Sequence, residues 1–320
     1  MSVLPLDCLC AGIVVADHVC APVAHLPAAG ELVTTERLQL TVGGCAANVA
    51  ADLARLGVQS GIVGRVGDDV FGRFVRESLQ AARVDCSGLE VSADAQTSGT
   101  LVVNVRGEDR RFIHTVGANA EFTGQGVTRE RLQACRVLYL GGYCLAENPD
   151  AAAVANMFRM AREANVLTVL DVVIPGPGEY WPRLAEVLPF TDVFLPNDDE
   201  ARAITGLTDP LRQLERFREA GARQAVVTCG GRGAVLSAGE KRLRVGTFPV
   251  EFVDGTGSGD AFVAGYIHGL ACGETLESCL RFGSALGASC VRSTGATTGV
   301  FTRSELEEFL SAHPLEVTEV

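Results

Sequence analysis

The segment from Asp254 to Asp260 places three glycines and two aspartates directly before a stretch typical of a helix. Glycines let backbone N–H groups turn toward one point, and a helix start adds partial positive charge, so Gly257, Ser258 and Gly259 could form an anion hole. Asp260 would lie in the first helical turn, close enough to take a proton from an alcohol that attacks a phosphoryl group. The loop alone does not separate this hypothesis from an Asp-Gly turn in which Asp260 only favours the helix start.

A second pair of segments contains groups that suit a polyol. Gly43 and Gly44 permit close backbone approach, and Asn48 offers donors and an acceptor near the start of a predicted helix; the alternative is a glycine turn with Asn48 near the helix cap. Asp17 follows the apolar run 12–16, which we interpret as the end of the first strand. Ligands of α/β sheets gather at the carboxyl ends of strands, so Asp17 is either a hydroxyl acceptor or a plain turn residue.

Two further segments suit a nucleotide and its metal. Asn197 and Glu200 are three residues apart at a helix start and could hold Mg²⁺ through water, or form a helix cap. Thr228 ends a predicted strand before Gly230 and Gly233, which could pass under a nucleotide or form a hairpin turn. Each pair of interpretations stays open at this point.

The order of the elements decides which of these segments can meet. From about residue 45, helix-like and short apolar segments alternate, which predicts repeated βα units and a mainly parallel sheet covered by helices on both faces. Predicted strands occupy 60–66, 137–140, 166–171, 192–195 and 225–228. Predicted helices occupy 46–56, 69–82, 149–164, 211–220, 257–271, 274–291 and 303–312.

Two stretches break the βα rhythm, at 18–41 and 98–116. We expect them to form a small antiparallel excursion, a β-sheet lid over the ends of the parallel strands that could exclude water from a reaction. The second stretch turns at Arg106 to Asp109. Arg106, Arg110 and Arg111 in it could clamp an anionic substrate, but a solvated turn face is the favoured interpretation.

Composition and charge narrow the class of protein and the partners that it can bind. The chain has 320 residues, a net charge of −12 and 11 cysteines without C-x-x-C spacing, so we expect buried thiols in a reducing cytoplasm rather than zinc or disulfides. The negative charge disfavours nucleic-acid and membrane partners. The apolar start runs into Asp17 and predicts a first strand rather than a signal peptide. A Rossmann fingerprint, a P-loop and the G-x-S-x-G of α/β-hydrolases are all absent.

Taken together, the segments resemble the PfkB (ribokinase-like) carbohydrate kinases over about residues 7–310. The amino-terminal signature is matched by Gly43 to Ala50 with Gly57 and Gly67, and the carboxy-terminal one by Asp254 to Asp260. The resemblance implies a single ribokinase-like three-layer α/β/α domain, 1–320, that transfers the γ-phosphoryl group of ATP to a hydroxyl of a sugar or related molecule. A non-catalytic regulatory protein on the same fold is the alternative, and the retained Asp260 argues against it.

The same resemblance implies roles for individual residues. Asp260 would be the base and Gly257 to Gly259 the anion hole. The substrate-binding positions would be Asp17, Gly43, Gly44 and Asn48. The ATP- and Mg²⁺-binding positions would be Asn197, Glu200, Thr228, Gly230, Gly233 and Ser284. Asp254 and Gly295 would hold a monovalent cation such as K⁺, and a homodimer would form through the lid.

Two departures from the family pattern bear on the substrate. Val15 stands where ribokinase-type members carry a polar residue, and Gly255 stands where Thr, Pro or Ser is commoner. We therefore expect an unphosphorylated sugar or nucleoside other than ribose, with sugar acids and sugar phosphates left open.

Overall fold

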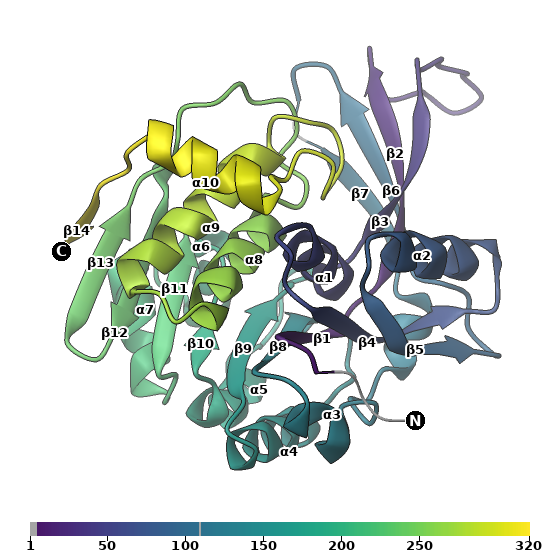
Figure 1. Ribbon diagram of the computed structural model, residues 1–320. Helices are drawn as coiled ribbons and strands as arrows, with labels where there is room; N and C mark the ends of the chain where they lie inside the picture. Colours follow the sequence, from purple (N-terminus) through teal and green to yellow (C-terminus); the bar gives the residue numbers. More distant parts are fainter. Residues whose placement is uncertain (1–4, 109) are drawn as a thin grey trace.

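The computed structural model describes residues 5–108 and 110–320, so Asp109 of the expected turn and the first four residues of the expected strand lie outside it. A ten-stranded sheet forms the centre of the molecule (Figure 1), in the order β14-β13-β12-β11-β10-β9-β8-β1-β4-β5. Pairs from β5 to β11 are parallel, whereas β11 to β14 are antiparallel. The strands are β1 Cys8–Gly12, β4 Ser60–Gly67, β5 Asp85–Ser92, β8 Val137–Tyr143, β9 Leu167–Val172, β10 Val193–Phe194, β11 Gln224–Thr228, β12 Ala234–Ala238, β13 Lys241–Val245 and β14 Val317–Glu319.

Helices cover both faces of this sheet, which confirms the three-layer α/β/α architecture. Alternate residues of β1 point to opposite layers: Cys8 and Cys10 pack into one apolar core, and Leu9 and Ala11 into the other. The first layer contains α1 Cys45–Arg55, α2 Val70–Ala81, α8 Ser258–Ala271, α9 Leu276–Cys290 and α10 Arg303–Ala312. The second contains α3 Arg129–Gln133, α4 Ala151–Glu163, α5 Trp181–Val187, α6 Asp198–Thr205 and α7 Pro210–Glu219.

A separate four-stranded sheet rises from the body and forms the predicted lid (Figure 1). Its strands lie in the order β3-β2-β6-β7, with bounds β2 Val15–Val23, β3 Leu38–Gly43, β6 Gly99–Val105 and β7 Arg111–Thr115. The expectation of an antiparallel excursion is wrong for one pair, because β2 and β6 are parallel. The reason is that β2 follows β1 and β6 follows β5, and β1 and β5 run in the same direction in the main sheet.

Short 3₁₀ helices at Gly117–Glu121, Leu188–Phe190 and Gly230–Arg232 complete the connections. The carboxyl ends of the parallel strands, the lid and the start of α8 converge on one side of the molecule. An isolated parallel bridge between Asn197 and Thr228 joins the loops after β10 and β11 there. Within the described part of the chain, no helix is both long and apolar enough to cross a bilayer.

Candidate active site

Asp260 lies in the first turn of α8, as expected, and the geometry requires a glycine three residues before it. Gly257 is the N-cap with φ 77°, and a Cβ there would lie 2.4 Å from the carbonyl oxygen of Ala296, so only glycine suits this position. A Cβ on Gly259 would meet no atom within 4 Å. Ser258 and Gly259 line a cavity of about 390 Å³. The start of α8 therefore faces open space with the polarity that binds anions.

Asn48 connects α1 to Asp260. Its Nδ2 donates a hydrogen bond of 2.8 Å to Asp260 Oδ2, while its Oδ1 is buried without a hydrogen-bond partner among the described residues. Asn48 is the fourth residue of α1 and not its cap, because the N-cap is Gly44. Gly44 has φ 88°, and a Cβ there would lie 2.6 Å from the carbonyl oxygen of Ile13. Asn48 thus positions the carboxylate of Asp260 and keeps one acceptor for another ligand.

Asp17 joins this group from the lid. It lies inside β2, in register with Thr41 and Thr100, so its expected place at the end of the first strand of the main sheet is wrong. Its side chain packs on Gly43, where a Cβ would lie 1.9 Å from Asp17 Oδ2. Burial raises the pKa of Asp17 to about 6, against the hydrogen bond from Thr100, and the charge of Asp260 adds to the rise. The polyol segments therefore meet beside Asp260.

The pKa of Asp260 is raised by burial, while hydrogen bonds from Asn48 and Cys45 lower it in part. Burial raises the free energy of the charged carboxylate, and the two donors stabilise it. A carboxylate held in this balance is a better proton acceptor than an exposed aspartate.

Two residues near Asp260 were missed from the sequence. The Sγ of Cys45 and carboxylate oxygens of Asp171 and Asp260 all lie within 4.8 Å of one another. Asp171 accepts a 3.2 Å hydrogen bond from the hydroxyl of Tyr139, and burial, then the charges of Glu200 and Asp260, raises its pKa. The signal for Asp171 was present, because it is an acid near the end of an apolar strand, at the carboxyl edge of the parallel sheet.

Asn197 and Glu200 form a capping box at the start of α6, which confirms the capping interpretation. Asn197 Oδ1 accepts from the Glu200 amide, and Glu200 Oε2 accepts from the Asn197 amide, both at 2.9 Å. Burial raises the pKa of Glu200 to about 7; the Asn197 amide lowers it, and the charges of Asp260 and Asp199 raise it further. Glu200, Asp171 and Asp260 are therefore three carboxylates that repel one another.

The segment from Thr228 to Gly233 is a hairpin between β11 and β12, as the simpler interpretation held. Gly233 is required by that turn, because a Cβ would lie 1.9 Å from the carbonyl oxygen of Val245. The same segment also lines the cavity that reaches Gly259, together with Ser284 and Ala288 of α9. Gly283 of the same helix packs against Phe262, because a Cβ on Gly283 would lie 3.0 Å from the Phe262 ring.

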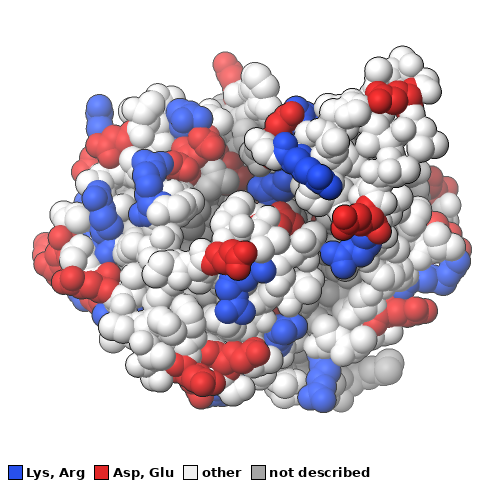
Figure 2. Space-filling model, turned by 90° about the horizontal axis from the view of Figure 1, so that it is seen from above, with Lys and Arg blue, Asp and Glu red and all other residues white. Residues whose placement is uncertain are grey.

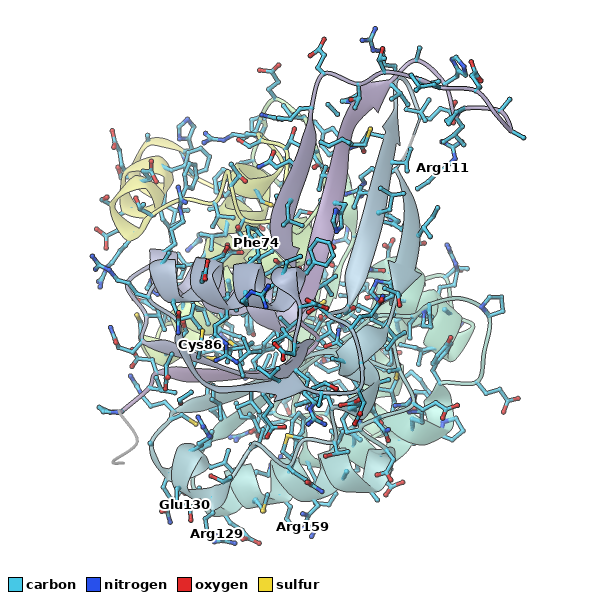
Figure 3. The ribbon with its side chains drawn as sticks, turned by 90° about the vertical axis from the view of Figure 1, so that its right-hand side faces the viewer. Phe74, Cys86, Arg111, Arg129, Glu130 and Arg159 are labelled. Carbon is cyan, nitrogen blue, oxygen red and sulfur yellow. The ribbon has the colours of Figure 1, made fainter. Side chains whose placement is uncertain are left out.

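The lid arginines differ in orientation. Arg106 and Arg111 are exposed, and Arg111 pairs with Glu108 at the edge of the lid sheet (Figure 3). The favoured interpretation, a solvated turn face, is wrong for Arg110. Its Nη1 lies 3.4 Å from Asp254 Oδ1 and donates 2.7 Å to Thr256 Oγ1. Asp254 Oδ2 accepts from the Gly295 amide at 3.1 Å, so the two residues expected at a cation site do lie together.

Charge on the surface is mixed. Figure 2 shows acidic and basic side chains interspersed over the face that contains the lid, without a continuous field of one sign on that face.

A three-layer fold, a β-sheet lid and a glycine-rich helix start with a half-buried aspartate define a small-molecule kinase of the ribokinase type. A model of the pfkB family of carbohydrate kinases matches residues 6–303. The chain belongs to this family, and it is a sugar or nucleoside kinase, a phosphotransferase that acts on a hydroxyl group.

Individual relatives agree on the fold and differ in the acceptor that their names give. The ribokinase of Bacillus subtilis is 30% identical over 285 residues, covering 89% of this chain and 93% of that protein. An ATP-dependent 6-phosphofructokinase of Thermoanaerobacterium thermosaccharolyticum is 29% identical over 265 residues, covering 79% and 80%. The ribokinase of Arabidopsis thaliana, solved in complex with ribose and ATP, has a TM-score of 0.83 at 25% identity, covering 96% and 99%.

Proposed function

We propose that this kinase takes ATP as the donor, requires Mg²⁺, and phosphorylates a hydroxyl of an unphosphorylated sugar or nucleoside with Asp260 as the base. The observation that carries the proposal is the 2.8 Å hydrogen bond from Asn48 to Asp260 beside a helix start that faces a 390 Å³ cavity. This arrangement supports the proposal, because a carboxylate that can accept a proton, an amide that can bind a hydroxyl and a helix start that can bind an anion lie together.

The donor end of the site is the cavity. Its lining includes the apolar side chains of Phe248, Val250 and Ala288, which suit the base of a nucleotide, and the helix start at Ser258 and Gly259, which suits its phosphates. Gly230 and Gly231 also line the cavity, and a Cβ on either glycine would meet no atom within 4 Å. A nucleotide can therefore lie close to the backbone along the hairpin. The roles given to Thr228, Gly230, Gly233 and Ser284 follow from this placement.

The acceptor end consists of Asp17, Asn48 and the backbone at Gly43 and Gly44. The carboxylate of Asp17 and the unpartnered Oδ1 of Asn48 are acceptors, which suit the hydroxyls of a sugar or of a ribose ring. An acceptor that already carries a phosphate needs a cationic clamp. Arg110 is engaged with Asp254 and Thr256, and Arg106 and Arg111 are exposed. These positions support an unphosphorylated acceptor.

The residues present suit a divalent cation. Asp171, Glu200 and Asp260 offer oxygen ligands, and burial raises the pKa of each. The charge of Asp260 raises the pKa of Asp171 and Glu200 further, which is the signature of acids that lack a counter-charge. Glu200 would hold Mg²⁺ through water, and Asp171 joins the expected pair as a further candidate. When bound, the ion neutralises charge on the donor phosphates.

The reaction follows from the position of Asp260. The acceptor hydroxyl, oriented by Asp17 and Asn48, gives its proton to Asp260 as its oxygen forms a bond to the γ-phosphorus. The bond from that phosphorus to the β-bridging oxygen breaks, and ADP leaves. The amides at the start of α8 stabilise the charge on the transferred group, and the lid excludes water.

An ATP-consumption screen over sugars, nucleosides, sugar acids and sugar phosphates tests the proposal. Turnover of an unphosphorylated sugar or nucleoside is the expected result, and turnover of a sugar phosphate alone would overturn the acceptor class. Tight binding of one compound without turnover of any would favour the non-catalytic regulatory alternative.

We further propose that residues 1–320 act as one cytoplasmic domain that pairs into a homodimer through the lid. Leu101 and Ile113 are cross-strand partners in the lid and are 40% and 67% exposed. Exposed apolar side chains on one face of a sheet suit a symmetric partner. All 11 cysteines are free, as suits a reducing compartment. Light scattering of Ile113→Asp checks the dimer: it should lower the mass to that of a monomer, and an unchanged dimer would exclude this interface.

A further inference from the structure

Arg110 connects the lid to the loop that carries the anion hole, and this contact has a consequence for the kinase reaction assigned above. The guanidinium Nη1 lies 3.4 Å from Asp254 Oδ1 and donates 2.7 Å to Thr256 Oγ1. Arg110 and Asp254 are 144 residues apart in the chain. The side chain of Arg110 is 26% exposed and that of Asp254 only 7%. The pair is thus largely shielded from water.

Asp254 needs a positive charge near it. A buried carboxylate is costly unless it is paired and hydrogen-bonded, and its charge lies at the start of a loop that must attract phosphate. The amides of Thr256 and Gly295 donate to its two oxygens at 2.9 and 3.1 Å. These amides satisfy hydrogen bonds but carry no net charge. Arg110 supplies that charge.

The surroundings are shaped for the guanidinium. A Cβ on Gly255 would lie 3.4 Å from Arg110 Nη2 and 3.5 Å from the ring of Phe252, so a branched residue at this position would crowd the arginine. The thiol of Cys290 lies 3.2 Å from the carbonyl oxygen of Thr256 and 3.1 Å from that of Ala296, so its S–H donates to one or the other. The thiol therefore engages one of these two carbonyl oxygens beside the loop.

We propose that Arg110 is the built-in counter-cation of the Asp254 loop, which takes the place of a bound monovalent cation and makes phosphoryl transfer independent of K⁺. Arg110 is a positioning residue: it acts on the anion hole through Asp254 and Thr256, and it holds the lid against the same loop. Gly255 stands where Thr, Pro or Ser is commoner in the family, and its lack of a side chain leaves room for the inward side chain of Arg110. This proposal competes with the K⁺ site expected at Asp254 and Gly295.

The test compares KCl with tetramethylammonium chloride at equal ionic strength, on the full chain, with two readouts. One is the melting temperature, which needs neither ATP nor an acceptor; the other is the rate of ATP consumption with the acceptor found in the screen. The variants are Arg110→Met, which removes the charge, and Arg110→Lys, which keeps it. Arg106→Met is the matched control, because Arg106 is an exposed arginine of the same hairpin.

The wild type and Arg106→Met should show the same melting temperature and rate in both salts, within about twofold for the rate. Arg110→Met should lose about tenfold or more of the rate in tetramethylammonium and regain it saturably with K⁺, because the ion replaces the missing charge. Its melting temperature should rise with K⁺ specifically, as binding to the folded state requires. Arg110→Lys should stay independent of K⁺.

The proposal is overturned if the wild type requires K⁺. It is also overturned if K⁺ changes neither the melting temperature nor the rate of Arg110→Met. If Arg110→Met does not fold, the wild type and Arg110→Lys still decide, because a K⁺ requirement in either contradicts the built-in charge. The melting temperatures give this answer even if no acceptor is phosphorylated. Failure of the proposed acceptor class and failure of the Arg110 proposal are therefore separate results.

Discussion

Asn48 and Asp260 are 212 residues apart in the chain and are joined by a 2.8 Å hydrogen bond from Nδ2 to Oδ2. The bond links the starts of α1 and α8, the two helices that begin at the family's glycine signatures.

Removing this hydrogen bond with Asn48→Ala should lower kcat by about 10- to 100-fold, because the base loses its orientation. It should also move the acidic limb of the kcat/KM profile to higher pH, because this hydrogen bond lowers a pKa that burial raises. Asn156→Ala on the exposed surface of α4 is the control, and an unmoved acidic limb would contradict the role of Asn48.

Replacing the base itself should separate chemistry from binding. Asp260→Asn keeps the shape and the contact to Asn48 but cannot take a proton, so kcat should fall by about 100-fold or more while ATP binding stays largely intact. Steady-state kinetics and calorimetric titration of ATP measure the two quantities. Asp94→Asn, at an exposed aspartate, should change neither. Near-normal turnover in Asp260→Asn would remove Asp260 from the mechanism.

Gly259 tests the anion hole without disturbing the fold. A Cβ there meets no atom within 4 Å and would enter the cavity. Gly259→Ala should therefore lower kcat/KM for ATP by about tenfold or more through misplaced phosphates, while the melting temperature stays level or rises, since alanine favours a helix. Gly246→Ala, where the Cβ would lie 3.8 Å from Leu315, is the matched control. A variant with full activity would show that phosphate does not lie against this turn.

Glu200 and Glu305 allow a matched test of magnesium binding, because both lie in capping boxes. Glutamine still accepts a hydrogen bond from the cap amide, so Glu200→Gln and Glu305→Gln should both keep the melting temperature near that of the wild type. Only Glu200→Gln should raise the apparent KM for Mg²⁺, by about tenfold. A magnesium titration of the rate measures this, and equal magnesium curves for the two variants would exclude Glu200 from the metal site.

Asp17 should make stability depend on pH. Its folded-state pKa of about 6 lies above the ordinary value of 3.8, so its contribution to stability is present below about pH 4 and is lost as the pH rises through 6. Asp17→Asn removes this loss. The free energy of unfolding of Asp17→Asn minus that of the wild type should therefore grow by about 3 kcal/mol from pH 4 to pH 7.5. Urea unfolding at the two pH values measures it, and a constant difference would show that Asp17 is not strained by burial.

Local patterns predicted the bounds of the longer helices well, but α3, α5, β5, β13 and β14 were not predicted. The helix 303–312 was predicted with the bounds that the structure shows, and those of the other predicted helices differ by one or two residues. Apolar periodicity and glycine positions express interactions within a few residues, so a linear sequence contains them. The capping box at Asn197 and the hairpin after Thr228 are of the same kind, and the simpler interpretation was confirmed for both.

Contacts between distant segments were not predictable in this way. Asp171 and Cys45 reach Asp260 only because the end of β9 and the start of α1 meet the start of α8 in the folded chain. The parallel pairing of β2 and β6 depends on the directions of β1 and β5. Asp17 was assigned to the wrong sheet because the apolar run 12–16 looks like one continuous strand. In the structure, β1 of the main sheet ends at Gly12, and β2 of the lid begins at Val15.

The sequence by itself determined the class of chemistry, because an anion hole at a helix start needs glycines and an aspartate at fixed local spacing, as Asp254 to Asp260 provide. The tertiary structure alone decided which charges face one another across the site. Arg110 and Arg111 are neighbours in the chain, yet one pairs with Asp254 and the other with Glu108 at the surface. Side chains alternate along an extended segment, and only the packing of the lid on the body determines which of the two is buried.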